Sequence, residues 1–375
     1  MLEIRPKAVT GGLDVTVPVS ARIWSYWGGG KDYFQVDKAA GDEFAALYPG
    51  IRPMARASRL FLGRAVSYLA GEAGVRQFLD IGAGLPSTQN THEVAQRAAP
   101  DSRVVYVDND PLVMSHARAL LRGVSKDTTG YIEGDLRDPA MILAVAREKL
   151  DFTRPVAIML MGIIGHIGNP AERDDDYALS LVDCLKEALP AGGYLVLRDA
   201  TDTEPDHVAA LRRYAATGAV PYRLRSPEQI TRFFDGLEPV EPGVVPVQRW
   251  RPDASSAELP EDINMWGAVA RKLAVLPQAL APNGAAPGGG GLWADGRAAG
   301  SAPVRPAPRW FFSWPGTLVR TSSLARSSRA LTSSRRFEHG CPAFLPAAKS
   351  AERAKGRIWP IDNQLARWSV TSQFL

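Results

Sequence analysis

Acidic residues next to a pair of glycines give the strongest chemical signal in the sequence. The run FLDIGAGLPS, from Phe78 to Ser87, ends a β-rich stretch on Asp80 and continues directly into Gly82 and Gly84. Glycines at that point let the backbone pass close to a ligand lying across the strand ends, where open α/β sheets bind cofactors. The pattern Gly-x-Gly alone is weak evidence, because Ser87 stands where a dinucleotide fingerprint has its third glycine.

Further carboxylates follow the next two β-rich runs. VVYVDNDP ends its run on Asp108, 26 positions after Gly82, and YIEGDLRDP places Asp135 after the third run. A carboxylate in the position of Asp108 can accept hydrogen bonds from both hydroxyls of a ribose. A dinucleotide also needs helix-end amides for its pyrophosphate, whereas a sulfonium nucleoside carries a positive charge and no phosphate. Acids after three successive strands therefore favour S-adenosylmethionine over NAD as the ligand.

These residues predict how such a nucleoside would lie. For Asp80 and Asp135, capping a helix or holding a turn is the alternative role. We expect the methionine and the ribose to lie along Asp80, Gly82 and Gly84, the ribose hydroxyls on Asp108, and the adenine beside Asn109 and Asp135.

One histidine follows the fourth β-rich run, where a methyl acceptor would lie. Methyl transfer is a displacement at a carbon that the sulfonium already activates, so alignment and exclusion of water matter most, and no metal is required. A base is needed where the acceptor is a hydroxyl or a protonated amine. His166, in MGIIGHIG, is the candidate catalytic residue, and hydrogen bonding within its own loop is the alternative role. Asp199, at the end of the fifth run, is a weaker candidate.

The elements that position these residues follow from the hydrophobic pattern. From residue 77 onward, short β-rich runs alternate with helical stretches, which is typical of a parallel sheet covered by helices. Before that point the spacing is helical, at about 19–27, 37–47 and 52–70. We predict strands at 77–81, 104–108, 129–133, 156–161, 194–199, 237–247 and 264–271, with helices at 91–99, 111–121, 139–150, 176–189 and 227–234.

Charge is unevenly distributed along the chain. The whole chain has a net charge of +4, but residues 273–375 hold 13 Lys and Arg against 4 Asp and Glu, so the preceding body is net acidic. That acidic body argues against nucleic acid as the partner, although the basic tail leaves nucleic-acid binding as an alternative interpretation. The chain shows neither a long apolar run nor a secretory leader, so we expect a cytoplasmic protein.

The sequence resembles a family of S-adenosylmethionine-dependent methyltransferases of high-GC bacteria, long known only as a domain of unknown function. The resemblance rests on a series of blocks between residues 18 and 272. These include SARIWSYWGGGKDYFQVD, RASRLFLGRAVSYL, GVRQFLDIGAGLPSTQNTHEVAQ, VVYVDNDPLVMSHARALL, GDLRDP, MGIIGHI, YLVLRDAT, FFDGLEPVEPGVVPV and MWGAVARK.

The resemblance implies an α/β fold, namely the class I methyltransferase sheet of seven strands with the last antiparallel. We divide the chain into an N-terminal helical layer or lid at 1–74, a cofactor-binding methyltransferase domain at 75–272, and a low-complexity, disordered tail at 273–375. The expected activity is methyl transfer from S-adenosylmethionine to an unidentified acceptor, with a small molecule favoured. A non-catalytic, S-adenosylmethionine-binding regulator is the alternative.

The run GGGKDYF raises a separate question, because glycines before a lysine can form a phosphate-binding loop. Such a loop needs a preceding strand and a hydroxyl residue after the lysine, whereas here the preceding stretch is helical and Asp32 follows Lys31. The resemblance instead implies a part of the helical layer that closes over the cofactor. Lys31, Asp32 and Tyr33 then either contact the bound ligands or only hold the lid in place.

Overall fold

The computed structural model describes residues 9–10, 13–87, 89–120, 128–168, 175–256, 259–260 and 263–274. All of them belong to one compact unit, Met1–Phe337. The tail predicted to be disordered, 273–375, lies outside the described residues except for its first two positions. The domain boundaries at 74 and 272 remain predictions.

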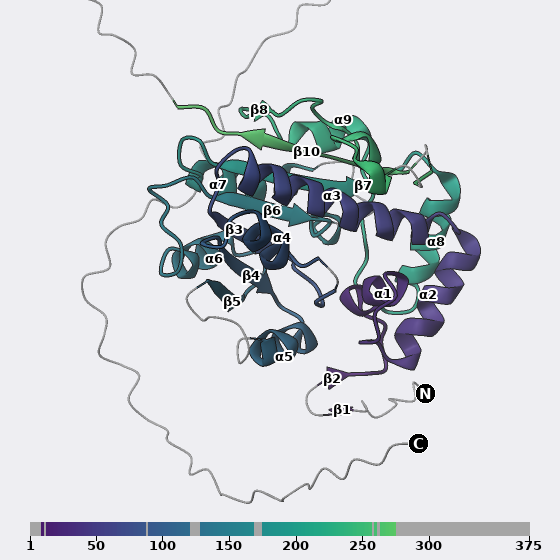
Figure 1. Cartoon of the computed structure of the whole chain (residues 1–375). Coiled ribbons are helices and arrows are strands. Elements are labelled where there is room, and N and C mark those ends of the chain that lie inside the picture. Colours follow the sequence, from purple (N-terminus) through teal and green to yellow (C-terminus); the bar gives the residue numbers. More distant parts are fainter. Residues whose placement is uncertain are drawn as a thin grey trace, which may run out of the picture. The chain divides into compact units, whose positions relative to one another are not determined.

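A mixed sheet forms the centre of the fold (Figure 1). Its first five strands in spatial order are parallel, and β10 then pairs antiparallel with β7. This is the predicted class I methyltransferase arrangement, with its antiparallel last strand. The spatial order is β5 (Thr129–Glu133), β4 (Arg103–Asp108), β3 (Gln77–Ile81), β6 (Ala157–Met161), β7 (Tyr194–Ala200), β10 (Met265–Arg271) and β8 (Glu238–Pro239), with β9 (Val245–Pro246) also paired to β10.

Helices cover both faces of the sheet, and each face has its own hydrophobic core. One core joins the sheet to α1 (Ser20–Trp27), α2 (Gln35–Leu47), α3 (Ile51–Gly71), α4 (Thr91–Ala98) and α8 (Pro205–Ala215). The other joins it to α6 (Pro139–Ala146), α7 (Asp176–Ala188) and α9 (Pro227–Arg232). The remaining described elements are α5 (Pro111–Leu120), the short pair β1 (Val9–Thr10) and β2 (Leu13–Asp14), and the 3-10 turns η1 (Ile164–His166), η2 (Val247–Arg249) and η3 (Ala254–Ser256).

Local sequence signals explain the strands and helix starts. The strand β3 is buried along its whole length, as a continuous apolar run covered on both faces requires. At α9 the predicted capping box is present: the Gln229 amide donates to Ser226 Oγ at 3.3 Å, and the Ser226 amide donates to Gln229 Oε1 at 2.8 Å. These bonds fix the start of α9 at the residue that the sequence predicts.

Two segments in the C-terminal half of the fold differ from the sequence prediction. The single strand expected at 237–247 is instead two pairs of residues, β8 and β9. Pro239, Pro242 and Pro246 lie within this stretch, and proline cannot donate to a ladder, so long pairing fails. The helix α8 was not predicted, although Pro205 stands at its first position as helix starts favour.

The glycine run after α1 ends that helix. Amides of Gly28, Gly29 and Gly30 donate to the carbonyls of Trp24, Tyr26 and Ser25, and Gly29 has a φ of 81°. Glycine adopts the left-handed conformation that often follows a helix without steric cost. The run is therefore a helix stop within the N-terminal layer, and the prediction that it is no phosphate loop agrees with its surroundings.

Candidate functional site

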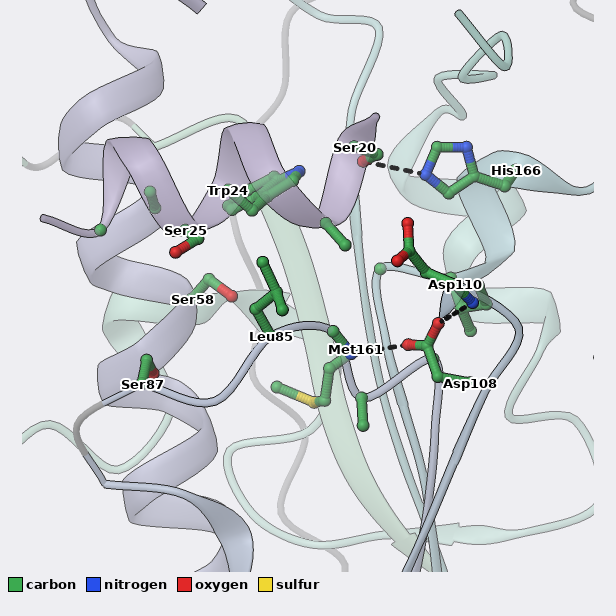
Figure 2. A pocket seen from close by; sticks show the side chains of 18 of the residues that line it. Ser20, Trp24, Ser25, Ser58, Leu85, Ser87, Asp108, Asp110, Met161 and His166 are labelled. Carbon is green, nitrogen blue, oxygen red and sulfur yellow. Dashed lines mark hydrogen bonds between the residues drawn. The ribbon is translucent and has the colours of Figure 1, made fainter. Parts of the chain in front are cut away.

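A large pocket lies at the carboxyl ends of the parallel strands, beneath α1 and beside α3. Its volume is about 1090 Å³, at the upper end of the roughly 300–1,000 Å³ usual for ligand pockets. Figure 2 shows α1 passing over it, with Ser20 beside His166 and with Asp108 and Asp110 on the side opposite Ser58. All the residues predicted to bind the cofactor line this pocket, as does the candidate base: Asp80, Gly82, Gly84, Asp108, Asn109, Asp135 and His166.

The glycine loop needs its two glycines for different reasons. Gly82 has a φ of 74°, and a Cβ there would lie 2.7 Å from Cβ of Ile163, in the loop after β6. Gly84 has a φ of 67°, and a Cβ there would meet nothing within 4 Å. Gly82 is thus held by packing as well as by backbone conformation, whereas the loop at Gly84 lies against open space on the pocket side.

Asp108 joins the tip of β4 to this loop. Its Oδ2 accepts from the Gly84 amide at 2.8 Å, and its Oδ1 accepts from the Asp110 amide at 2.9 Å. Burial raises the pKa of the Asp108 carboxyl, which these amides partly offset. Each carboxylate oxygen can accept more than one hydrogen bond. The fixed carboxylate therefore keeps acceptor capacity for a pair of hydroxyls in the pocket.

Asp80 is the least satisfied carboxylate of the site. It is 4% exposed, and its Oδ2 accepts from Thr91 Oγ1 at 2.6 Å, whereas its buried Oδ1 has no hydrogen-bond partner among the described residues. Burial raises the pKa of Asp80 to about 6. The Thr91 bond ties the carboxylate to the first residue of α4, whose N-cap is Asn90, so Asp80 does not itself cap the helix. The second oxygen is buried and unpaired among the described residues, so Asp80 acts on the pocket through its negative charge.

Asp135 and Asn109 are linked to each other. Asn109 Nδ2 donates to Asp135 Oδ2 at 3.0 Å, and the amide and guanidinium of Arg137 both donate to the same carboxylate. Arg137 also donates to the backbone oxygen of His166 at 2.8 Å. Asp135 therefore holds a turn and connects the tips of β4 and β5 to the loop after β6, while still lining the pocket.

His166 faces α1 across the pocket. Its Nδ1 lies 3.3 Å from the Pro221 carbonyl, and its Nε2 lies 3.1 Å from Ser20 Oγ. A carbonyl only accepts, so the proton belongs on Nδ1, and Nε2 then carries the lone pair. Burial lowers the pKa of His166, which favours the neutral ring. The arrangement suits a base whose acceptor nitrogen points to the pocket side.

Asp199 differs from His166 because it is fully buried and outside the pocket lining. Tyr222 donates to it through a short hydrogen bond, and Arg225 Nη1 lies 3.2 Å from its Oδ2. The Tyr222 ring in turn packs edge-on against His166, with centroids 5.0 Å apart. Asp199 thus supports the wall behind His166.

Arg59 of α3 and Arg198 of β7 line the pocket, although neither was among the residues predicted for the site. Arg59 is only partly exposed, and Arg64 of the same helix is buried and donates to the Trp250 and Val247 carbonyls. Helical spacing was the sequence signal for the burial of Arg59 and Arg64, because it places both arginines on the same side as the apolar residues of α3.

The residues after the glycine run lie away from the pocket lining. Tyr33 packs on Tyr26 of α1 with ring centroids 4.9 Å apart, and Asp32 Oδ1 lies 3.6 Å from Nε2 of His116 in α5. These contacts fit the interpretation that the run holds the lid in place.

S-adenosylmethionine fits this donor set. Asp80 places a negative charge at the pocket, Asp108 offers fixed acceptors for a ribose, and the loop at Gly84 leaves open space. Within the described ranges, no three His, Cys, Asp or Glu side chains could hold a metal ion. No helix in the same ranges is long and apolar enough to cross a membrane.

Comparison with known proteins agrees with this arrangement. A sequence profile described as S-adenosyl methyltransferase matches residues 6–273. A solved DUF574 family structure from Streptomyces avermitilis is 46% identical, with a TM-score of 0.64, and the match covers 69% of this chain and 99% of that one. A candidate methyltransferase from Thermobifida fusca is 39% identical, with a TM-score of 0.62 and coverage of 70% and 98%. No curated protein matches the sequence. The chain belongs to the S-adenosyl methyltransferase family, whose members are enzymes that use S-adenosylmethionine.

Proposed function

We propose that this enzyme methylates a hydroxyl or amine of a small-molecule acceptor, with His166 as the general base. The observation that carries the proposal is the placement of His166 and the acidic residues in one pocket that α1 covers. A pocket closed in this way suits a small molecule better than a side chain presented on a large partner surface. Residues on the β3, β4 and β5 side then bind the cofactor, and the loop after β6 meets the acceptor.

When bound, S-adenosylmethionine supplies a methyl group on a positively charged sulfur. Asp108 binds the ribose hydroxyls, and the negative charge of Asp80 lies beside the positively charged end. Asn109 and Asp135 border the adenine. His166 Nε2 accepts the acceptor's proton, displacing the Ser20 hydroxyl that it now contacts. The hydrogen bond from Nδ1 to the Pro221 carbonyl holds the ring in the required tautomer.

The first test is calorimetric titration of S-adenosylmethionine into the full-length protein. Saturable binding is expected, and Asp108→Ala should weaken it by at least about a hundredfold, because two charge-assisted hydrogen bonds of about 1.5–3 kcal/mol each are lost. Asp101→Ala is the matched control, since Asp101 is an exposed carboxylate paired with Arg76 away from the pocket. Equal affinity of the two variants would refute the assignment of Asp108.

The second test screens small hydroxyl and amine compounds by formation of S-adenosylhomocysteine. Once an acceptor is found, His166→Ala should lower kcat by about 10²–10⁴-fold and change the affinity for S-adenosylmethionine little. The variant should also lose the rise of activity between low and neutral pH. Binding of the cofactor with turnover of no acceptor would instead support the non-catalytic regulator.

A further inference from the structure

Arg198 is a buried cation whose guanidinium has no close acceptor. It is 6% exposed, and its Nε has no hydrogen-bond partner in the part of the chain that the structure describes. The side chain makes no hydrogen bond or salt bridge to any residue in the described ranges, and its Cζ lies 5.1 Å from the centroid of the Trp24 ring. Asp80, Asp199 and Tyr222 act on it only at longer range. Burying a charge without a partner costs free energy, and such unpaired buried charges are typical of ligand-binding sites.

The position of Arg198 separates it from the ribose side of the pocket. It lies on β7 opposite Met161 of β6, and its guanidinium rests against Gly162, where a Cβ would collide with it. The loop that begins at Gly162 carries His166. The strands β3 and β6 stand between β7 and β4, which carries Asp108. Arg198 is thus on the side of the pocket where the base meets the acceptor.

Charge in the pocket is segregated in the same direction. The lining holds four aspartates, all on the β3, β4 and β5 side, and five arginines, of which four come from α3 and β7. Arg52 is paired with Asp42, which lies outside the lining, so the other four arginines balance the four aspartates. S-adenosylmethionine, with its sulfonium, ammonium and carboxylate, then adds one positive charge. A ligand carrying a negative charge on the α3 and β7 side would balance this excess.

We propose that the methyl acceptor carries an anionic group, a carboxylate being the best match, and that Arg198 binds it while the reacting atom lies near His166. This inference rests on the proposed function of the same site. A guanidinium forms two parallel hydrogen bonds with a carboxylate, so Arg198 would fix both the charge and the orientation of the acceptor. The Trp24 ring would cover the guanidinium on the α1 side.

The test uses 4-hydroxybenzoate and its neutral counterpart 4-hydroxybenzamide as probes. Each is titrated into the full-length protein saturated with S-adenosylhomocysteine. The acid should bind at least tenfold more tightly than the amide, and Arg198→Met should abolish this preference. Arg198→Lys, which keeps the charge, should restore part of it. Arg52→Met is the matched control, because Arg52 lines the same pocket but is exposed and paired with Asp42, and it should keep the preference.

A second measurement distinguishes a carboxylate of the acceptor from the carboxylate of the cofactor. If Arg198 binds the acceptor, Arg198→Met should leave the affinity for S-adenosylhomocysteine within about threefold. If it binds the carboxylate of the cofactor, that affinity should fall while the affinity for 5′-methylthioadenosine, which lacks the amino-acid end, stays the same. That result overturns the acceptor assignment but keeps the methyltransferase function.

Equal binding of the acid and the amide, or binding of neither, also overturns the inference. Failure of the unaltered protein to bind S-adenosylhomocysteine would remove the proposed function on which the inference rests. Circular dichroism of each variant confirms that the fold is retained before the affinities are compared.

Discussion

Replacing Asp80 with asparagine should stabilise the unliganded protein at neutral pH while weakening cofactor binding. Asp80 is buried, one of its oxygens has no hydrogen-bond partner among the described residues, and burial raises its pKa to about 6. Asparagine has the same shape without the charge. The substitution therefore removes the cost of burying a carboxylate and removes the negative charge that faces a cationic ligand.

The magnitude follows from linkage between protonation and folding. A carboxyl whose pKa is raised in the folded state binds its proton more tightly there, so the stability falls as pH rises from about 4 to about 6 and stays low above that. The difference between the ordinary value of 3.8 and about 6 corresponds to about 3 kcal/mol at 1.36 kcal/mol per unit. The new amide group leaves N–H donors unpaired, which costs about 1–2 kcal/mol. Asp80→Asn should thus be more stable by about 1–2 kcal/mol at pH 8 and less stable by a similar amount at pH 4.

Urea unfolding at several pH values between 4 and 8 measures this change of sign. Asp151→Asn is the control, because hydrogen bonds from Thr153 lower the pKa of the exposed Asp151 carboxyl, so that variant should lose stability at high pH. Titration with S-adenosylmethionine should show at least a tenfold loss of affinity in Asp80→Asn. A stability difference that does not vary with pH would refute the reasoning, since it would mean that Asp80 carries no penalty for its charge.

Further variants test other parts of the structure. Gly82→Ala should lower the free energy of unfolding by about 2–4 kcal/mol, because it adds left-handed strain and a collision with Ile163, whereas Gly84→Ala should cost about 1–2 kcal/mol; equal losses in thermal or urea unfolding would contradict this. Arg64→Met should destabilise by about 3–5 kcal/mol in the same assay, since it leaves two buried carbonyls and a serine hydroxyl without their donor. Burial lowers the pKa of His207 to about 4, so stability should fall as pH drops below about 6.5; His207→Gln should lose about 2 kcal/mol less than the unaltered protein between pH 7.5 and pH 5.

The strands and most helices could be predicted from the sequence because their signals are local. Strand β3 and strand β5 begin and end where the apolar runs do, and the capping box fixes the start of α9. The errors fall where local signals conflict with pairing. Prolines divide the stretch 237–247 into β8 and β9, and α8, which packs on α2, lies in a segment of polar composition.

The acidic half of the site was equally accessible to sequence reasoning, since Asp80, Asp108 and Asp135 follow strands whose carboxyl ends must meet at one edge of a parallel sheet. The basic half was not. Arg198 lies within β7, where its side chain could face either side of the sheet, and only the packing of α1 over that face shows that the guanidinium borders the pocket. A buried charge inside a strand was the one available signal.

Asp80 and Arg198 are both buried at the pocket, and their charges have opposite signs. Each is a buried ionisable group at the pocket, and each has an atom that no described residue satisfies. The two do not form a salt bridge with each other, although their charges would favour it. The two charges interact with each other, with Arg59 and with Asp199 only at longer range, so neither has a direct ion pair among the described residues. A positively charged cofactor beside Asp80 and a negatively charged acceptor beside Arg198 would explain both, and would bring the two reactants together in the orientation that methyl transfer needs.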